Sequence, residues 1–151
     1  MHLTEEQQQK IEEVARKYSL KFILLHGSYA TDKMKIGSDL DIALLGEKLI
    51  EFEELLAIYS DLAEIFGDNP HRELDVKSLH KADPFFCYQV AKDSQLLYGD
   101  RTDFNEFKAY AFSNYFDSKD LFRLEKILIQ KFQNYLNQKY AHWYSFYSKK
   151  N

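Results

Sequence analysis

The chain has 151 residues, 45% of them hydrophobic and 29% charged, and its formal net charge is −4. This length and composition suit a single globular domain with its own core and exclude a disordered chain. The small acidic excess argues against direct binding along a nucleic-acid backbone, which favours a strongly basic surface.

Further features of the sequence predict a soluble cytoplasmic protein. The first residues, MHLTEEQQQKIEE, are polar and do not form a signal peptide. No apolar run approaches the ~20 residues that a membrane-spanning helix needs, so no membrane contact is expected. Cys87 is the single cysteine, which excludes an intramolecular disulfide and fits a reducing compartment.

The first part of the chain predicts a helix followed by two strands. Thr4 and Gln7 have the spacing of a capping box, and apolar residues then recur at helical intervals. The segment 21–26 (KFILLH) is short and apolar and stops at Gly27, which is typical of a buried strand. After a polar turn, residues 39–45 (DLDIALL) become fully apolar and predict a second, central strand.

The middle of the chain predicts a helix, a strand and another helix. Apolar residues at helical spacing indicate a helix over 51–66, which Gly67 ends. Residues 73–79 (ELDVKSL) alternate between apolar and charged side chains, as a strand does. An Asp-Pro pair then opens a helix over about 83–92.

The C-terminal third predicts helices and completes an α/β (α+β) chain. Asp103 and Glu106 have the spacing of a capping box at the start of one helix, and a second helical stretch begins at Asp120. The aromatic tail from Tyr140 to Tyr147 either docks a partner or folds back on the core. We expect one domain over 1–151 with a C-terminal helical extension from about residue 103.

Two short stretches carry the chemistry. Gly27 allows a sharp turn and lets a phosphate approach without a Cβ in the way. Ser28 adds a hydroxyl beside exposed backbone N–H groups, which together form an anion site. Asp39 and Asp41 are two residues apart on one predicted strand, so their carboxylates point to the same face and suit Mg²⁺. Asp75 lies between apolar residues on another strand and is the best third carboxylate.

Each of these assignments has a simpler alternative. Taken alone, Asp39 and Asp41 equally well open a strand that faces solvent, and a Gly-Ser pair is a common turn. Exposed strand faces carry Asp routinely, so Asp75 also fits a surface position. Lys77 lies on the same face as Asp75 and either contacts a phosphate or is a solvated lysine of an edge strand. His26 fits a strand-end histidine bonded to the backbone better than a metal ligand.

The spacing of these residues resembles a known superfamily. Gly27-Ser28, ten further residues and then Asp39-Leu40-Asp41 match the signature of the polymerase-β-like nucleotidyltransferases, and ELDV around Asp75 matches their third strand. The short chain and the early motif resemble the minimal nucleotidyltransferases (MNT), which are antitoxins paired with HEPN toxins. The resemblance implies the nucleotidyltransferase fold, a small mixed sheet covered by helices.

The resemblance also implies roles for the site residues. Gly27, Ser28 and the neighbouring Ser38 would hold the nucleotide, and the three carboxylates of Asp39, Asp41 and Asp75 would bind Mg²⁺ and act in catalysis.

The expected activity is an Mg²⁺-dependent transfer of AMP from ATP to a tyrosine hydroxyl of a HEPN ribonuclease toxin, with which the chain forms a hetero-oligomer as the antitoxin. Two other functions stay open. A non-catalytic antitoxin would neutralise the toxin by binding alone, although such a protein has no need of the carboxylates. A small-molecule nucleotidyltransferase of the aminoglycoside type usually carries a separate acceptor domain, for which 151 residues leave little room.

Overall fold

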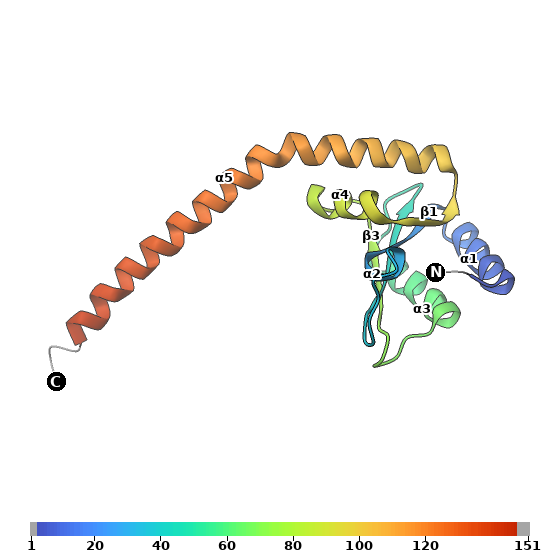
Figure 1. Ribbon diagram of the computed structural model, residues 1–151, viewed down its shortest axis with the longest axis horizontal. Coiled ribbons are helices and arrows are strands. Elements are labelled where there is room, and N and C mark those ends of the chain that lie inside the picture. The colour runs from blue at the N-terminus through green and yellow to red at the C-terminus, as the bar shows by residue number, and fades with distance from the viewer. Residues whose placement is uncertain (1–2, 148–151) are drawn as a thin grey trace. The chain divides into compact units, whose positions relative to one another are not determined.

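The computed structural model describes residues 3–147, and it describes side chains through residue 140. In chain order these residues form α1 (Glu5–Lys17), β1 (Leu20–His26), α2 (Gly27–Ala30), β2 (Leu40–Gly46), α3 (Phe52–Phe66), β3 (Leu74–Ser78), α4 (Pro84–Asp93), β4 (Gln95–Gly99) and α5 (Arg101–Tyr147) (Figure 1). The chain divides into two compact units after Tyr115.

The first unit is built on a four-stranded sheet with the strand order β3-β2-β1-β4. β1 runs antiparallel to both β2 and β4, whereas β2 and β3 are parallel. The prediction of a small mixed sheet in an α/β chain is therefore confirmed. β2 lies inside the sheet, as its fully apolar second half indicates.

Helices cover both faces of this sheet because successive residues of a strand point to opposite sides. On β1, Ile23 and Leu25 join the core with α1 and α3, whereas Phe22 and Leu24 join a second core with α4 and the start of α5. All four side chains are fully buried. Burying a side chain of this size stabilises the fold by about 1.5–3 kcal/mol, so the two cores hold β1 firmly between them.

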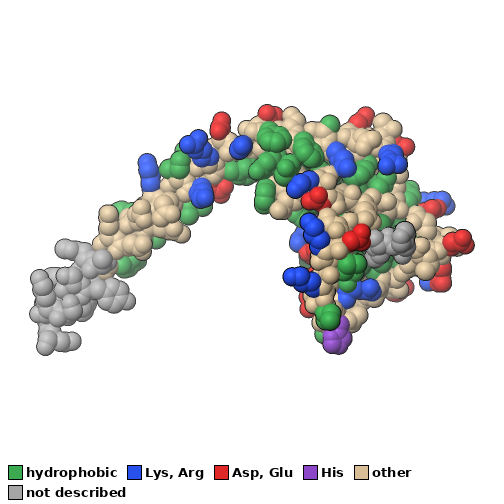
Figure 2. Space-filling view, viewed as in Figure 1, with side chains coloured by type: hydrophobic (Ala, Val, Ile, Leu, Met, Phe, Trp, Pro, Cys, Tyr) green, Lys and Arg blue, Asp and Glu red, His purple; other side chains and the backbone are tan. Residues whose placement is uncertain are grey.

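The second unit is the part of α5 that follows Tyr115. Large apolar side chains are exposed along its described length, and Figure 2 shows them interspersed with Lys and Arg. They are Phe116, Leu121, Leu124, Ile127, Leu128, Ile129, Phe132, Tyr135 and Tyr140. The side chains of the aromatic tail beyond Tyr140, for which a docking or core role was expected, lie outside the described residues.

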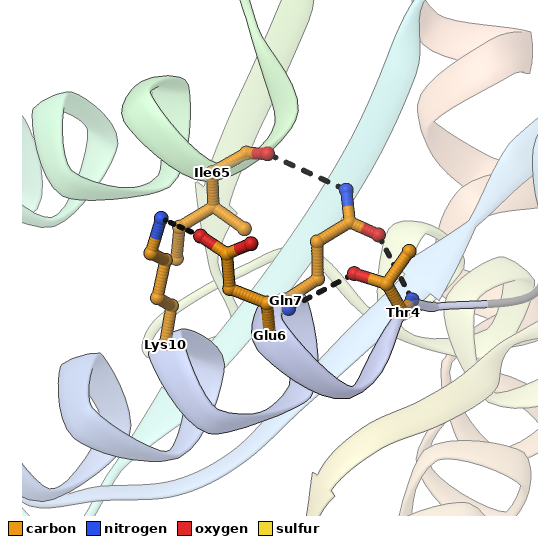
Figure 3. A network of polar contacts seen from close by, with 5 residues as sticks. All are labelled: Thr4, Glu6, Gln7, Lys10 and Ile65. Atoms are coloured by element: carbon orange, nitrogen blue, oxygen red, sulfur yellow. Dashed lines mark hydrogen bonds and ion pairs between the residues drawn. The ribbon is translucent and has the colours of Figure 1, made fainter.

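The capping box predicted for α1 is present (Figure 3). The Thr4 hydroxyl accepts the N–H of Gln7 at 3.2 Å, and the Gln7 side chain accepts the N–H of Thr4 at 3.1 Å. The Gln7 amide also donates to the carbonyl of Ile65 at 3.5 Å, which ties α1 to α3. One turn further on, Lys10 forms an exposed ion pair with Glu6 at 2.7 Å.

The capping residue predicted for the C-terminal helix, Asp103, was wrong, although the helix starts close to the expected position. Helix α5 begins at Arg101, and the carboxylate of Asp100 accepts the N–H groups of Thr102 at 2.7 Å and Asp103 at 3.2 Å. The break expected before Asp120 is also absent from the described helix, which runs on through Tyr147. Neither Gly nor Pro occurs over 101–147, so nothing in the backbone interrupts the helix.

Strand β4 was not predicted. It follows α4 directly, without the Gly or Pro that usually marks such a boundary. It ends at Gly99, whose φ is +118°, and a Cβ there would lie 2.5 Å from the carbonyl oxygen of Lys21 on the paired strand. A glycine is therefore needed where the edge strand leaves the sheet.

Within residues 3–147, no helix combines the length and the apolar character that crossing a lipid bilayer requires.

Candidate active site

Three of the polar residues singled out from the sequence lie in one row across the sheet. The register pairs His26 of β1 with Asp41 of β2, and Asp41 with Asp75 of β3. His26 is in phase with Leu24, and Asp41 with Ala43, so both lie on the sheet face that α4 covers. Asp41 and Asp75 are therefore neighbours, as the prediction of a three-carboxylate site requires.

Gly27 lies directly against one of these carboxylates. Its φ is +69°, a conformation that favours glycine. A Cβ on Gly27 would stand 2.2 Å from Oδ2 of Asp41, so no other residue fits without displacing the carboxylate. The sequence indicated a tight turn at this position, and the structure adds that the turn is in contact with Asp41.

Hydrogen bonds to the backbone hold the Gly-Ser turn, which continues into the short helix α2. The Thr31 hydroxyl donates to the carbonyl of Gly27 at 3.1 Å, and the N–H of Lys33 donates to the carbonyl of Ser28 at 3.0 Å. These bonds fix the turn without using the Ser28 hydroxyl. Ser28 as a residue is half-buried in this turn.

Asp39 lies outside the strand on which it was predicted. Strand β2 begins at Leu40, whose N–H donates to the carbonyl of Glu73 at 2.8 Å, and Asp39 is exposed just before it. The pairing of β2 with β3 begins only at Leu40, so Asp39 takes no part in the sheet. Asp39 still acts on Asp41 by charge, so it lies near the row.

Ser38 closes the loop before β2. Its hydroxyl accepts the N–H of Lys35 at 2.9 Å, and its own N–H donates to the carbonyl of Lys35 at 3.0 Å. The structure thus gives Ser38 a turn-forming role, and its contact with a nucleotide stays a prediction.

The charges of the site act strongly on one another. Burial raises the pKa of the Asp41 carboxyl, and the negative charges of Asp75 and Asp39 raise it further. Burial lowers the pKa of His26 to about 4, so this ring is neutral at pH 7. The His26 ring packs edge-on against Phe86 of α4 at 5.6 Å between centroids. An accumulation of negative charge beside a neutral imidazole is an environment that favours a bound cation.

Asp75 is not buried as its apolar neighbours suggested. Its side chain is 40% exposed, and it forms an ion pair with Lys77, which lies on the same face of β3. Lys77 lies on the edge strand β3 with 53% of its side chain exposed, as a solvated lysine would, and its contact with a phosphate stays a prediction. The structure shows the ammonium paired with a carboxylate of the row.

The carboxylate oxygens of the site are ligands that suit Mg²⁺, although the carboxylates do not converge on one point in this structure. In the part of the chain that the structure describes, no three His, Cys, Asp or Glu side chains form a group that could hold a metal ion. Mg²⁺ commonly uses one or two carboxylates and takes its other ligands from water and substrate phosphates. Asp41 beside the Gly27 turn, together with Asp39 and Asp75, fits a metal that arrives with a nucleotide.

A separate depression of about 540 Å³ is lined by residues from the opposite strand ends. It includes Lys21, Glu47, Gly99 and Asp103, and Lys21 pairs with Asp103 at 3.4 Å. The space beside Gly99 is bounded by Lys21 and Phe22 and not by a carboxylate, so we assign the chemistry to the His26 end of the sheet.

Phe86 is the residue of this site that sequence reasoning missed. Its ring lies between His26 and Lys77, with 5.8 Å from its centroid to the Lys77 Nζ. The sequence signal was its place just after the Asp-Pro start of α4, on the helix that faces the row. Only the packing of α4 on the sheet shows that this position reaches the site.

Comparison with known proteins agrees with this geometry. Residues 9–103 match the family model described as polymerase beta, nucleotidyltransferase. Over 126 residues the chain is 28% identical to the protein adenylyltransferase MntA of Aphanizomenon flos-aquae (strain 2012/KM1/D3), which covers 79% of this chain and 82% of that protein.

Two solved complexes contain chains of similar structure. One is a toxin–antitoxin complex with AMP-PNP, at 24% identity and a TM-score of 0.65, with 83% of this chain and 98% of that chain covered. The other is a tri-AMPylated HEPN toxin of Shewanella oneidensis with an MNT antitoxin, at 23% identity and a TM-score of 0.61, with 85% and 97% covered. At these identities the two complexes establish a shared fold. Because the family model spans more than half of the sequence, this chain belongs to the polymerase beta nucleotidyltransferase family.

Proposed function

We propose that this chain transfers AMP from Mg²⁺–ATP to a tyrosine hydroxyl of a HEPN-type ribonuclease toxin and thereby acts as the antitoxin. One observation carries the proposal, the contact of the Asp41 carboxylate with Gly27. It brings a candidate metal ligand against a candidate phosphate-binding turn, and nucleotidyl transfer needs both at one point. The single cysteine supports action in the cytoplasm.

The residues of the site have two roles: they bind the nucleotide with its metal, and they accept a proton from the acceptor. Ser28 and the backbone of the turn would hold the triphosphate, and Asp39, Asp41 and Asp75 would hold the metal together with the phosphates. Bound Mg²⁺ supplies positive charge that offsets the negative charge of the phosphates. The phenolic oxygen of the acceptor attacks the α-phosphorus, and pyrophosphate leaves. Asp75 takes the phenolic proton, since a phenol is a weak nucleophile until it loses that proton.

The named relatives support a protein acceptor. The MntA relative is described as a protein adenylyltransferase, and the toxin in one similar complex is tri-AMPylated. An AMP group adds a bulky anion to the toxin. Near an RNA-binding surface such a group would repel the phosphates of the RNA and silence the ribonuclease.

The described part of α5 beyond Tyr115 supplies a surface for that partner. Its exposed apolar residues include Leu121, Leu124, Leu128 and Phe132, which recur at helical spacing and form one stripe. Exposed apolar side chains in such number mark interaction sites. We name this stripe the α5 apolar stripe and assign the toxin to it.

The decisive experiment mixes this chain, Mg²⁺, ATP and the partner toxin and then measures intact masses. We expect the toxin to gain one or more AMP units. The doubly substituted Asp39→Asn, Asp41→Asn protein should add none, whereas Asp93→Asn, an exposed change on α4, should leave the transfer intact.

The two other functions are outcomes of the same experiment. If the toxin is silenced without a mass change, and equally well by the Asp39→Asn, Asp41→Asn protein, the chain is an antitoxin by binding alone. If AMP passes to an added aminoglycoside and not to the toxin, the acceptor is a small molecule.

A further inference from the structure

The ammonium group of Lys77 lies beside the carboxylates of the site. Lys77 follows Asp75 by two residues on β3, so both side chains leave the strand on the same face. The Lys77 Nζ donates to Oδ2 of Asp75, and the pair is partly exposed, with 53% of the lysine side chain and 40% of the aspartate side chain open to solvent. The ammonium therefore engages a carboxylate that the proposed function assigns to the metal.

An aromatic ring borders the ammonium on the side of α4. The Lys77 Nζ lies 5.8 Å from the ring centroid of Phe86, a distance at which a cation is attracted to an aromatic face. The Phe86 ring is itself packed edge-on against His26. Because the ring belongs to another element, the lysine is held at the site by α4 as well as by its neighbour on β3.

The charge of Lys77 reaches two carboxylates. The ammonium pairs directly with the Asp75 carboxylate. Asp41 lies opposite Asp75 in the register of β2 and β3, on the same face of the sheet, and is within reach of the charge of Lys77. One ammonium thus offsets part of the negative charge on both Asp41 and Asp75.

We propose that Lys77 is the internal counter-ion of the metal-free site and competes with the metal for its carboxylates. The inference rests on the proposed function, which makes Asp41 and Asp75 ligands of Mg²⁺. Lys77 is here a positioning residue: it has to leave Asp75 before that carboxylate can turn to a metal. The mixed state, in which ammonium and metal share one carboxylate, places two cations side by side and is unfavourable.

This competition couples the metal to the nucleotide. Without nucleotide, a divalent ion gains the carboxylates of Asp41 and Asp75 but displaces a paired ammonium, so it binds weakly. A nucleotide brings phosphates that supply the missing ligands and give the released ammonium another anion. Metal and nucleotide then each raise the affinity of the other by the same factor. Lys77 would in this way limit metal loading until ATP is present.

The test titrates the metal-free protein with Mn²⁺ by calorimetry, without nucleotide. The Lys77→Met protein keeps an unbranched side chain, one atom shorter, and loses the charge, and we expect it to bind Mn²⁺ about two- to five-fold more tightly, the range set by a partly exposed ion pair. The Lys77→Arg protein keeps the charge and should bind as the wild type does. Lys10→Met is the matched control, since it removes an exposed lysine–carboxylate pair on α1 (Figure 3) and should change nothing.

A second titration repeats the measurement with AMP-PNP present. The factor by which AMP-PNP improves Mn²⁺ affinity should be smaller for Lys77→Met than for the wild type, because the competitor has been removed. If Lys77→Met binds Mn²⁺ no more tightly than the wild type does, Lys77 is a surface lysine and this inference alone fails. If the wild type takes up no metal even with AMP-PNP, the proposed function fails and the inference fails with it.

Discussion

The two parts of helix α5 share a helical spacing of apolar residues but differ in how far these residues are buried. Before the division at Tyr115, Phe104 is 7% exposed and Ala111 is fully buried. After it, Leu121 is 64% exposed and Phe132 is 61% exposed. Both parts carry apolar residues at helical spacing, so the periodicity alone does not say whether a face meets the core of its own chain or a partner.

Charge separates the two parts more clearly than the apolar pattern does. Within the helix, residues 101–115 carry two Lys or Arg and two Asp or Glu, whereas residues 116–147 carry five and three. A basic amphipathic helix on an otherwise acidic chain is typical of a segment that binds another molecule. The comparison therefore assigns the first part of α5 to the fold and the second part to recognition, and substitutions on each side can test that assignment.

The largest effect is expected in the buried part. Phe104 packs against Phe22 of β1 with 6.2 Å between ring centroids and belongs to the core under α4. Phe104→Ala removes a buried ring and leaves a cavity, so the free energy of unfolding should fall by about 3–5 kcal/mol. Urea denaturation measures this change. A loss below about 1 kcal/mol would place Phe104 among ordinary surface positions and break the comparison.

The matching substitution in the exposed part should leave the fold alone. Phe132→Ala should change the free energy of unfolding by less than about 0.5 kcal/mol, as surface substitutions do. Its effect should appear in binding, where losing an aromatic anchor costs about 2–4 kcal/mol. Calorimetric titration of the toxin into the wild type and into Phe132→Ala measures the difference.

The control for this pair is a polar residue of the same helix. Gln130 is exposed and its side chain donates to Asn134 of the same helix at 3.3 Å, so Gln130→Ala should weaken neither folding nor toxin binding. Equal toxin affinity for Phe132→Ala and Gln130→Ala would contradict the assignment of the toxin to the α5 apolar stripe.

The Gly27-Ser28 turn should behave differently from both parts of α5, because its backbone is held by hydrogen bonds while the Ser28 side chain would contact the nucleotide. Ser28→Ala leaves the backbone bonds of the turn in place, so the thermal midpoint should stay close to that of the wild type. Binding of Mg²⁺–ATP should weaken by about 1.5–3 kcal/mol, the contribution of one hydrogen bond to a charged group. Thermal melts with and without Mg²⁺–ATP measure both quantities. A large drop in the midpoint with unchanged ATP affinity would make Ser28 a structural turn residue.

Much of the fold was predictable, because local signals and tertiary packing agree over β1, β2 and α3. The apolar run of β1 stops at Gly27, and helix α3 ends at Gly67. Thr4 caps α1 and Asp83 caps α4. β4 was not predictable, since its apolar residues follow α4 without a turn signal and become a strand only by pairing with β1.

The candidate site was predictable in part for the same reason. The spacing from Gly27 to Asp41 anticipates that the two segments meet, and they are in contact. The spacing also placed Lys77 on the same face as Asp75, with which it pairs, but the position of Phe86 beside them depends on how α4 packs and cannot be inferred from spacing along the chain. The strand start at Leu40, which leaves Asp39 outside β2, depends on the register between β2 and β3.

The smallest effects should come from the residues that cap the N-termini of helices α1 and α5. Thr4→Ala removes a neutral cap and should lower the free energy of unfolding by about 0.5–2 kcal/mol at every pH. Asp100→Ala removes a charged cap, and its effect should depend on pH. The N–H groups of Asp103 and Thr102 lower the pKa of the Asp100 carboxyl in the folded protein.

The sign follows from that direction. Since the folded pKa lies below the unfolded value, the stabilisation by Asp100 is fully present above the unfolded value and is lost as the pH falls through the folded one. Thermal melts from pH 7 down to pH 3 should therefore show the deficit of Asp100→Ala shrinking toward acid while that of Thr4→Ala persists. A deficit of Asp100→Ala that stays constant to pH 3 would mean that its carboxylate does not cap α5, and that the first turn of this helix is held by packing against the sheet instead.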